Sequence, residues 1–365
     1  MLHLTFLWKG LRDLMFEHEY VGNLHVHSLY SDGAATIKEI GACAGSAGLD
    51  FVCVNDHSHM SKDLHLEEEG YHGSVLVLVG SEIGIRSHHY LAFGLKKPVI
   101  ENEQSPQQVI DAVKAQGALG FIAHPFEKGM PFLEKSVVYT WNDLSVKGFS
   151  GICIWNFTSR WKERIRTVFH GLFCISFKAK TLRGPSDETL AYWDRICMER
   201  KVVAIGGSDA HGTYVKLGPM RLIPFTYDFL LRTINVHILL NRKMPKDFQA
   251  AKEQVYGALS AGRLFIAHDG LSSSKGFRFD YMSEEGSELF MGEDGALGRG
   301  GSIVVETPRW AEIRLIRNGE RIRSWRGKEA VYRIAERGVY RVEVYLRVPL
   351  FGWRPWIYSN PIYLR

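Results

Sequence analysis

Residues able to bind metal ions recur along the first 215 residues, each beside a short apolar run. The first group lies in "NLHVHSLYSDG" (23–33), which contains His25, His27 and Asp32. Side chains of an extended strand alternate between two faces, so His25 and His27 point the same way. Two imidazoles on one face can supply half of a metal site. For this segment alone, two surface histidines beside a turn are the alternative.

Five further segments carry the same kinds of side chain. They are "FVCVN" with Asp56 and His57, "VLVLVG" with Glu82, "HYLAFG" with His88 and His89, "LGFIA" with His124, and "VVAIGG" with Asp209 and His211. His88 and His89 face opposite ways in a strand, so at most one of them can be a ligand. Randomly placed histidines would not sort to one edge, so these segments together predict one site.

The pattern of apolar runs predicts how these segments meet. Between residues 20 and 225, the runs alternate with helical patterns such as 105–117, with Ser105 as N-cap, Pro106 as first helical residue and Gly117 at the end. This alternation is typical of parallel α/β proteins. In a parallel barrel the carboxyl ends of the strands form one rim, where the active site is built.

The C-terminal part of the sequence has a different character. Strand-like runs joined by turns follow one another, and Asn318-Gly319 between two of them signals a type I′ hairpin. We expect an antiparallel β-sandwich over 269–365, behind a barrel over 20–268. The apolar start of the chain favours a helical lead-in over 1–19.

Composition narrows the class of protein. The 365 residues are 45% hydrophobic and carry a formal net charge of +5. This charge suits a small anionic substrate but is too mild to predict nucleic-acid binding. Five cysteines without a CxxC pair are expected to be reduced core residues.

The sequence also carries expectations about location and assembly. It has no run of 18 or more apolar residues, which predicts no membrane span. The apolar start is too short and too interrupted for a signal peptide, so we expect a cytoplasmic protein. Edge strands of the β-domain could pair subunits into an oligomer.

Six short motifs follow one another along residues 20–215: "HVHSLYSDG", "NDH", "GSE", "HYLAFG", "AHP" and "GSDAH". In this order they resemble the polymerase and histidinol phosphatase (PHP) family. The resemblance implies a distorted (β/α)7 TIM-like barrel holding two or three divalent metal ions. It also implies that His89 rather than His88 is the ligand. Three further motifs are "GNLHVHS", "ALSAGRLFIAH" and "YSNPIYL". Together they are similar to a PHP subgroup that includes carbaryl hydrolase. Members of this subgroup have a β-rich C-terminal domain.

The same resemblance implies how the ligands divide among the metals. The first ion would be held by His25, His27, Glu82 and Asp209; Glu82 would bridge to a second ion held with His89 and His124; a third would be held by Asp32, His57 and His211. Two features depart from the family pattern. Asn23 stands where many members have Asp, and the stretch before "GSDAH" is long and basic, which suggests a substrate-specific insertion.

This donor set, without cysteine, suits Zn²⁺, Mn²⁺ or Fe²⁺. Two such ions lower the pKa of a bridging water, so a metal-bound hydroxide could attack a phosphomonoester or phosphodiester. Glu82, Asp209 and His211 are the expected catalytic residues. Alternatives are a carboxyl-ester, carbamate or amide hydrolase, and a non-catalytic scaffold or binding module.

Residues that would hold the substrate are harder to choose. Arg160 follows the strand that ends at Asn156, and His59 follows His57, so these two are the candidates. For Arg160 the alternative is a solvated helix face, which is the usual role of a charge run. For His59 the alternative is exposure in a polar loop.

Overall fold

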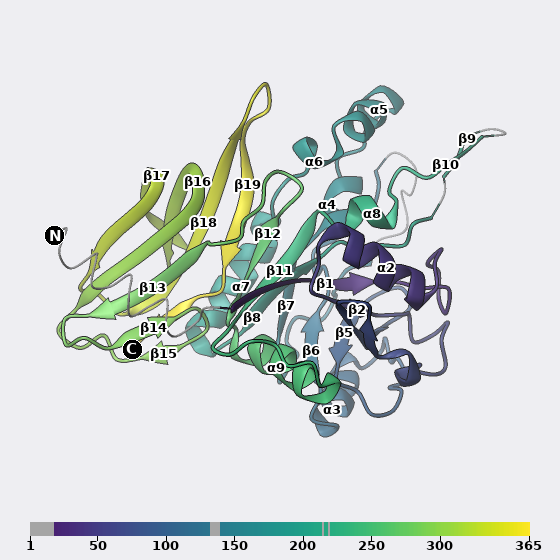
Figure 1. Ribbon diagram of the computed structural model, residues 1–365, viewed down its shortest axis with the longest axis horizontal. Helices are drawn as coiled ribbons and strands as arrows, with labels where there is room; N and C mark the ends of the chain where they lie inside the picture. Colours follow the sequence, from purple (N-terminus) through teal and green to yellow (C-terminus); the bar gives the residue numbers. More distant parts are fainter. Residues whose placement is uncertain (1–17, 132–138, 214, 218–219) are drawn as a thin grey trace.

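The computed structural model describes residues 18–131, 139–213, 215–217 and 220–365 (Figure 1). An α/β part is followed by a mostly β C-terminal region, which lies on the left of Figure 1. Most of the predicted helical lead-in, residues 1–17, lies outside the described residues. The prediction is wrong for His18 and Glu19, which begin a strand.

Seven strands of the α/β part run around the site. They are β1 (His18–Val26), β2 (Phe51–Val54), β4 (Val75–Ile83), β5 (Tyr90–Phe93), β6 (Leu119–Ile122), β7 (Gly151–Asn156) and β8 (Val203–Gly207). Each pairs with the next in this order, and a parallel bridge between Val26 and Ala210 joins the first strand to the segment after the last.

The expectation of parallel strands throughout is wrong at β5. This strand pairs antiparallel with both β4 and β6, whereas the other pairs among the seven strands are parallel. Because β5 runs backwards, its first residue lies at the rim where its neighbours end. His88 and His89 therefore reach the rim by preceding a strand.

Helices connect and cover the strands. They are α2 (Ile37–Ala47), α3 (Pro106–Ala115), α4 (Phe157–Lys162), α5 (Val168–Ser176), α6 (Lys178–Thr181), α7 (Asp187–Glu199), α8 (Tyr227–Leu230) and α9 (Phe248–Ala261). The predicted start of α3 is confirmed, with Ser105 at the N-cap position and Pro106 first in the helix. α2 begins with a reciprocal capping box between Thr36 and Glu39, which satisfies backbone N–H groups at the start of the helix. Among the described residues, no helix is both long and apolar enough to cross a membrane.

The remaining elements are mostly strands. In the α/β part they are the 3₁₀ helix η1 (Leu66–Glu68) and strands β3 (Gly70–His72), β9 (Val215–Leu217), β10 (Met220–Leu222), β11 (Ile234–Leu240) and β12 (Leu264–His268). The C-terminal region holds β13 (Arg278–Ser283), β14 (Glu288–Phe290), β15 (Asp294–Gly295), β16 (Gly301–Arg317), β17 (Glu320–Ile334), β18 (Gly338–Val348), β19 (Gly352–Ser359) and β20 (Ile362–Leu364). The predicted hairpin at Asn318-Gly319 is confirmed: both residues have positive φ, and Arg317 pairs with Glu320 across the turn.

β12 forms a wall shared by two hydrophobic cores. Its side chains alternate, so Leu264 and Ile266 enter the core of the α/β part, while Phe265 and Ala267 enter the C-terminal core. β12 pairs with β11 on one side and with β19 on the other. The two parts are therefore joined through one continuous sheet.

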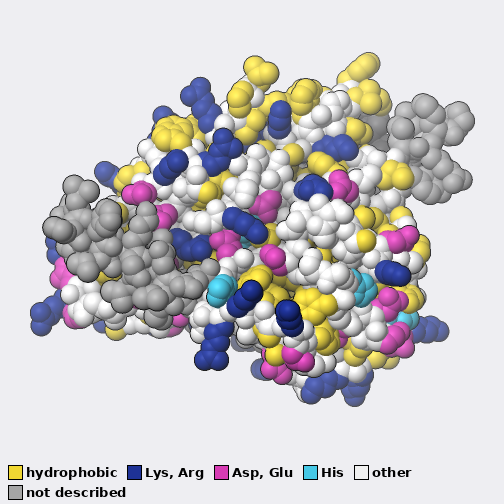
Figure 2. Space-filling model, in the orientation of Figure 1, with side chains coloured by type: hydrophobic (Ala, Val, Ile, Leu, Met, Phe, Trp, Pro, Cys, Tyr) yellow, Lys and Arg dark blue, Asp and Glu magenta, His cyan; other side chains and the backbone are white. Residues whose placement is uncertain are grey.

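The end of the molecule at the top of Figure 2 is rich in exposed apolar side chains. They include Phe169 and Phe173 on α5 and Leu350 in the turn between β18 and β19. Phe351 in that turn lies against Phe177, with ring centroids 5.3 Å apart. α5, α6 and this turn therefore meet at one tip.

Candidate metal centre

The rim residues predicted from sequence converge on one buried carboxylate, Glu82. Its Oε2 lies 3.2 Å from His25 Nε2, 3.3 Å from His27 Nε2 and 3.3 Å from His57 Nδ1. Its Oε1 lies 2.9 Å from His89 Nδ1 and 3.2 Å from His124 Nε2. Each oxygen thus faces a different set of histidines, as a carboxylate bridging two cations would.

Three groups of ligand atoms surround this carboxylate. They are His25, His27, Glu82 and Asp209; His57, Glu82 and His89; and His27, Asp32, His57 and His211. Within each group the ligand atoms lie within 4.8 Å of one another. Shared members make the three groups one continuous cluster.

Backbone geometry aims two of these side chains. His124 and Asp209 have φ of 28° and 56°, in the left-handed region that residues with a Cβ rarely adopt. Such conformations cost about 1–3 kcal/mol and are concentrated at functional sites. Each of the two residues lies two positions beyond the end of a strand, β6 or β8, and both belong to the cluster around Glu82.

The turn after β1 returns Asp32 to the cluster. Asp32 Oδ1 lies 3.2 Å from His211 Nε2, and Asp32 Oδ2 lies 3.7 Å from His57 Nε2. Gly33 permits the turn, because a Cβ there would overlap the His27 carbonyl. The Asp32 side chain is 42% exposed whereas that of His27 is fully buried, so the centre opens to solvent on the Asp32 side.

The donor atoms of the cluster are placed to bind cations rather than to form hydrogen bonds with one another. Both ring nitrogens of His25 and His27, and Nδ1 of His57, are buried without a hydrogen bond to any described residue. Carboxylate oxygens lie within 3.4 Å of His25 and His27, but without hydrogen-bond geometry. Buried polar atoms left unpaired are costly, and divalent ions among these donors would satisfy them.

Charge supports the same conclusion. Burial opposes protonation of His124, but Glu82 and Glu127 outweigh it and raise the pKa of His124 to about 9. Burial also opposes protonation of His211, yet Asp209 and Asp32 raise its pKa to about 9. The carboxylates therefore create a strongly negative potential at the centre, which favours bound cations.

Sequence reasoning missed several residues that hold the ligands. Asn156 Nδ2 donates to Asp209 Oδ2 at 3.2 Å. Buried Glu127 pairs with Lys162, accepts from Ser159 Oγ at 2.6 Å and lies 3.4 Å from His124 Nδ1. Glu127 follows His124 by three residues and Asn156 ends a strand, so these positions were the available signals.

Asn23, the departure from the family pattern, supports the backbone. Its Oδ1 accepts from Ser208 N at 3.3 Å and from Ser208 Oγ at 3.1 Å, and its Nδ2 donates to the Ile234 carbonyl at 2.9 Å. Asp56, beside His57, accepts from Ser28 N at 2.8 Å. Both residues hold the strand ends together and lie behind the ligands.

The structure separates the adjacent histidines His88 and His89. His89 faces Glu82, whereas His88 Nε2 accepts from the backbone N–H groups of Asn142 and Asp143 at 3.1 and 3.2 Å. His59 lies beside the centre, with its ring 5.3 Å from that of His57, and its Nδ1 is 3.0 Å from the Gly84 carbonyl.

Arg160 is not among the ligand groups. Its guanidinium pairs with Glu163, and its Nε donates to the Gly184 carbonyl at 2.8 Å. It lines a cleft with Glu163 and Arg164, and it also lines a small cavity together with His124 and Asn156. The basic stretch before "GSDAH" forms α4 to α7 and the walls of that cleft.

Comparison with known proteins finds a family match in the first part of the chain. Residues 23–185 match the PHP domain family. Asp209 and His211 lie beyond the matched residues, yet the structure brings them into the same centre. No curated protein matches the chain.

Among solved structures, the chain is similar to a two-domain protein of Bacteroides vulgatus, which is described as containing a predicted PHP-like metal-dependent phosphoesterase. The two sequences are 14% identical, and the TM-score is 0.46. The match covers 94% of this chain and 95% of that one. A protein of Bifidobacterium adolescentis, provisionally assigned as a metal-dependent phosphoesterase, is 16% identical over 52% of this chain and 87% of its own, with TM-score 0.32. An amidohydrolase of Chromobacterium violaceum with bound sulfate and no metal is 14% identical over 56% and 98%, with TM-score 0.28. These likenesses are too distant to assign an activity.

Proposed function

We propose that this protein is a metal-dependent phosphoesterase that hydrolyses a small phosphomonoester or phosphodiester. The observation that carries the proposal is the position of Glu82, whose two oxygens face separate sets of histidines within one buried cluster. The match to the PHP domain family over residues 23–185 supports it. The donor set of histidines and carboxylates, with no cysteine among them, favours Zn²⁺, Mn²⁺ or Fe²⁺.

Each ligand group has a distinct task in this proposal. His25, His27, Glu82 and Asp209 would hold one ion, Glu82 with His89 and His124 a second, and Asp32, His57 and His211 a third. Divalent ions at such a site acidify bound water and stabilise charge on the phosphoryl oxygens. Asn156 fixes one oxygen of Asp209, and the Tyr139 carbonyl, 3.1 Å from His124 Nδ1, fixes the ring of His124 with Glu127 beside it.

His211 is the residue best placed to move a proton near the opening. Its Nδ1 lies 3.0 Å from the Asp209 carbonyl oxygen and its Nε2 3.2 Å from Asp32 Oδ1, and its side chain is 20% exposed. The histidines beside Glu82 are more deeply buried. We therefore propose that His211 holds the third ion when that ion is bound, and that it positions or protonates the substrate on the Asp32 side when that ion is absent.

A second candidate is hydrolysis of a carboxyl ester, carbamate or amide. The observation favouring it is that Arg160, the cation expected to clamp phosphate, is engaged by Glu163 and Gly184 instead. The similarity in sequence to the carbaryl-hydrolase subgroup supports the same alternative. A carbonyl substrate needs no clamp of this kind.

Turnover of aryl phosphate, bis-aryl phosphate and aryl acetate by the purified protein distinguishes the candidates. Phosphate turnover that His25→Ala and Asp209→Ala both abolish supports the phosphoesterase. Turnover of acetate alone supports the second candidate. A folded wild type that binds no metal and turns over none of the three would contradict both.

The finer description of the fold is also proposed. We infer that strands β1, β2 and β4 to β8 form the distorted seven-stranded barrel, with a boundary near residue 268 before a β-sandwich. The bridge between Val26 and Ala210 supports closure of the barrel, and the change of core along β12 supports the boundary.

A further inference from the structure

A basic cleft lies between α4–α7 and the C-terminal strands. Six cations line it: Lys128, Arg160, Arg164, Arg166, Arg183 and Arg354. The cleft has a volume of about 860 Å³, within the range of small-molecule sites. Its opposite wall is formed by Tyr345, Pro355 and Tyr358 of β18 and β19.

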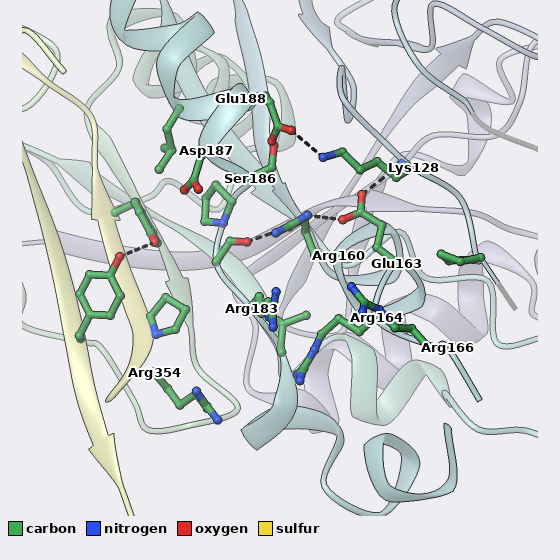
Figure 3. A pocket seen from close by; sticks show the side chains of 18 of the residues that line it. Lys128, Arg160, Glu163, Arg164, Arg166, Arg183, Ser186, Asp187, Glu188 and Arg354 are labelled. Carbon is green, nitrogen blue, oxygen red and sulfur yellow. Dashed lines mark hydrogen bonds and ion pairs between the residues drawn. The ribbon is translucent and has the colours of Figure 1, made fainter. Parts of the chain in front are cut away.

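The cations of the cleft outnumber its carboxylates. Lys128 pairs with Glu188, and Arg160 pairs with Glu163, as the dashed lines in Figure 3 show. The other four arginines pair with no carboxylate among the described residues, and Asp187 is the remaining carboxylate of the described lining. The described part of the cleft therefore has an excess of positive charge.

Like charges converge here from separate segments. Arg164 and Arg166 follow α4, Arg183 precedes α7 and Arg354 lies on β19. Burial lowers the pKa of Arg164, and the nearby charges of Arg183, Arg354 and Arg160 lower it further. Gathering such charges destabilises the folded protein unless an anion compensates them.

The walls of the cleft are fixed by their own hydrogen bonds. Arg354 Nε donates to the Lys180 carbonyl at 2.8 Å, and Trp155 Nε1 donates to the Arg183 carbonyl at 3.0 Å. Arg341 on β18 makes two buried bonds of 2.6 and 2.8 Å to Asp194 on α7. The arginines are thus mounted on a framework that is already assembled.

The cleft is separate from the metal centre. Between them lies a small cavity lined in part by His124, Asn156, Ser159 and Arg160, with a volume of about 10 Å³. This is about the room that one water requires, so a phosphate group cannot pass through it. An anion in the cleft would therefore not reach Glu82 through this cavity.

We propose that the basic cleft is a second binding site, which takes a small anion with at least two linked phosphate groups. Guanidinium groups bind phosphate through paired N–H donors, and four arginines without carboxylate partners exceed what one phosphate needs. The proposal goes beyond the proposed function and does not depend on it.

Titration calorimetry with inorganic tripolyphosphate tests the site. We expect Arg183→Ala/Arg354→Ala to weaken binding roughly tenfold or more, because two charge-assisted contacts are lost. Arg321→Ala/Arg323→Ala removes the same charge from β17, outside the described cleft lining, and should bind nearly as tightly as wild type. Asp209→Ala should keep the binding, which separates the cleft from the metal centre and from metal extraction by the probe.

Three results would overturn the proposal: wild-type affinity in the cleft variant, equal losses in both arginine pairs, or loss of binding in Asp209→Ala. Circular dichroism checks that each variant folds. If the alanine pair does not fold, Arg183→Gln/Arg354→Gln keeps the first three side-chain carbons and a polar end without the charge, and must show the same loss.

Discussion

His89 Nδ1 and Glu82 Oε1 lie 2.9 Å apart, both buried, although the strands that carry them run in opposite directions. Glu82 belongs to β4, whereas His89 directly precedes β5. Reversal of β5 brings the start of one strand beside the end of the other. The second set of donors around Glu82 depends on this relationship.

Replacing Glu82 tests the bridging arrangement. Glu82→Gln removes the negative charge shared by the donor groups, so we expect bound metal to fall and hydrolysis to drop about 100-fold or more. Elemental analysis measures bound metal, and turnover of aryl phosphate measures hydrolysis. Glu67→Gln, at a glutamate whose side chain is 70% exposed, is the matched control and should leave both unchanged.

The adjacent histidines His88 and His89 provide a second matched pair of variants. His89→Ala removes a donor beside Glu82 and should lower metal content and activity. His88→Ala removes an acceptor of two backbone N–H groups, so we expect a loss of about 1–3 kcal/mol in unfolding free energy with metal retained. Metal loss in His88→Ala but not in His89→Ala would show that the two roles are exchanged.

Much of the centre was predictable from sequence, because ligand residues at strand ends meet at one rim. This holds whatever the loops and helices between the strands look like. The direction of β5 was not predictable, since alternation in a four-residue apolar run is the same for either direction. The left-handed backbone at His124 and Asp209 also leaves no mark in residue type. Glu127 and Asn156 were missed because their partners lie on other elements.

The division of the chain into an α/β part and a C-terminal β region was also predictable only in part. The change to strands joined by turns was visible in sequence, and so was the Asn318-Gly319 hairpin. The role of β12 was not, because "LFIAH" is apolar at successive positions and either face could be buried. Only tertiary packing assigns Leu264 and Phe265 to different cores.

Metal removal should destabilise the folded protein. Chelation leaves buried histidines and carboxylates without compensation, and any ligand that binds only the folded state contributes stability. We expect the melting temperature to fall by several degrees in chelator and to recover when metal is restored. An unchanged melting temperature after verified removal of bound metal would count against a structural contribution from the ions.

A buried cluster away from the metal centre predicts a pH dependence of stability. His237 Nδ1 lies 2.7 Å from Glu19 Oε1, and Nε2 lies 3.0 Å from Asp269 Oδ2. Burial opposes protonation, but Asp269 and Glu19 raise the pKa of His237 to about 9. Its stabilising contribution is therefore complete below about pH 6.5 and is lost as pH rises through about 9.

Urea unfolding from pH 6 to 10 measures this contribution. Wild type should lose on the order of 2 kcal/mol more than His237→Gln over that range, because the variant has no imidazolium to deprotonate. Glu19→Gln should reduce the pH dependence in part. Parallel curves for wild type and His237→Gln would refute the assignment.

The central claim is a multinuclear metal centre organised around Glu82 that hydrolyses phosphate esters. Its most direct test measures bound metal per chain and aryl phosphate turnover on the same samples of wild type and Asp209→Ala. We predict two or three ions per chain with measurable turnover in wild type, and fewer ions with no turnover in the variant. A folded wild type with no bound metal, or turnover unchanged in Asp209→Ala, would contradict the account.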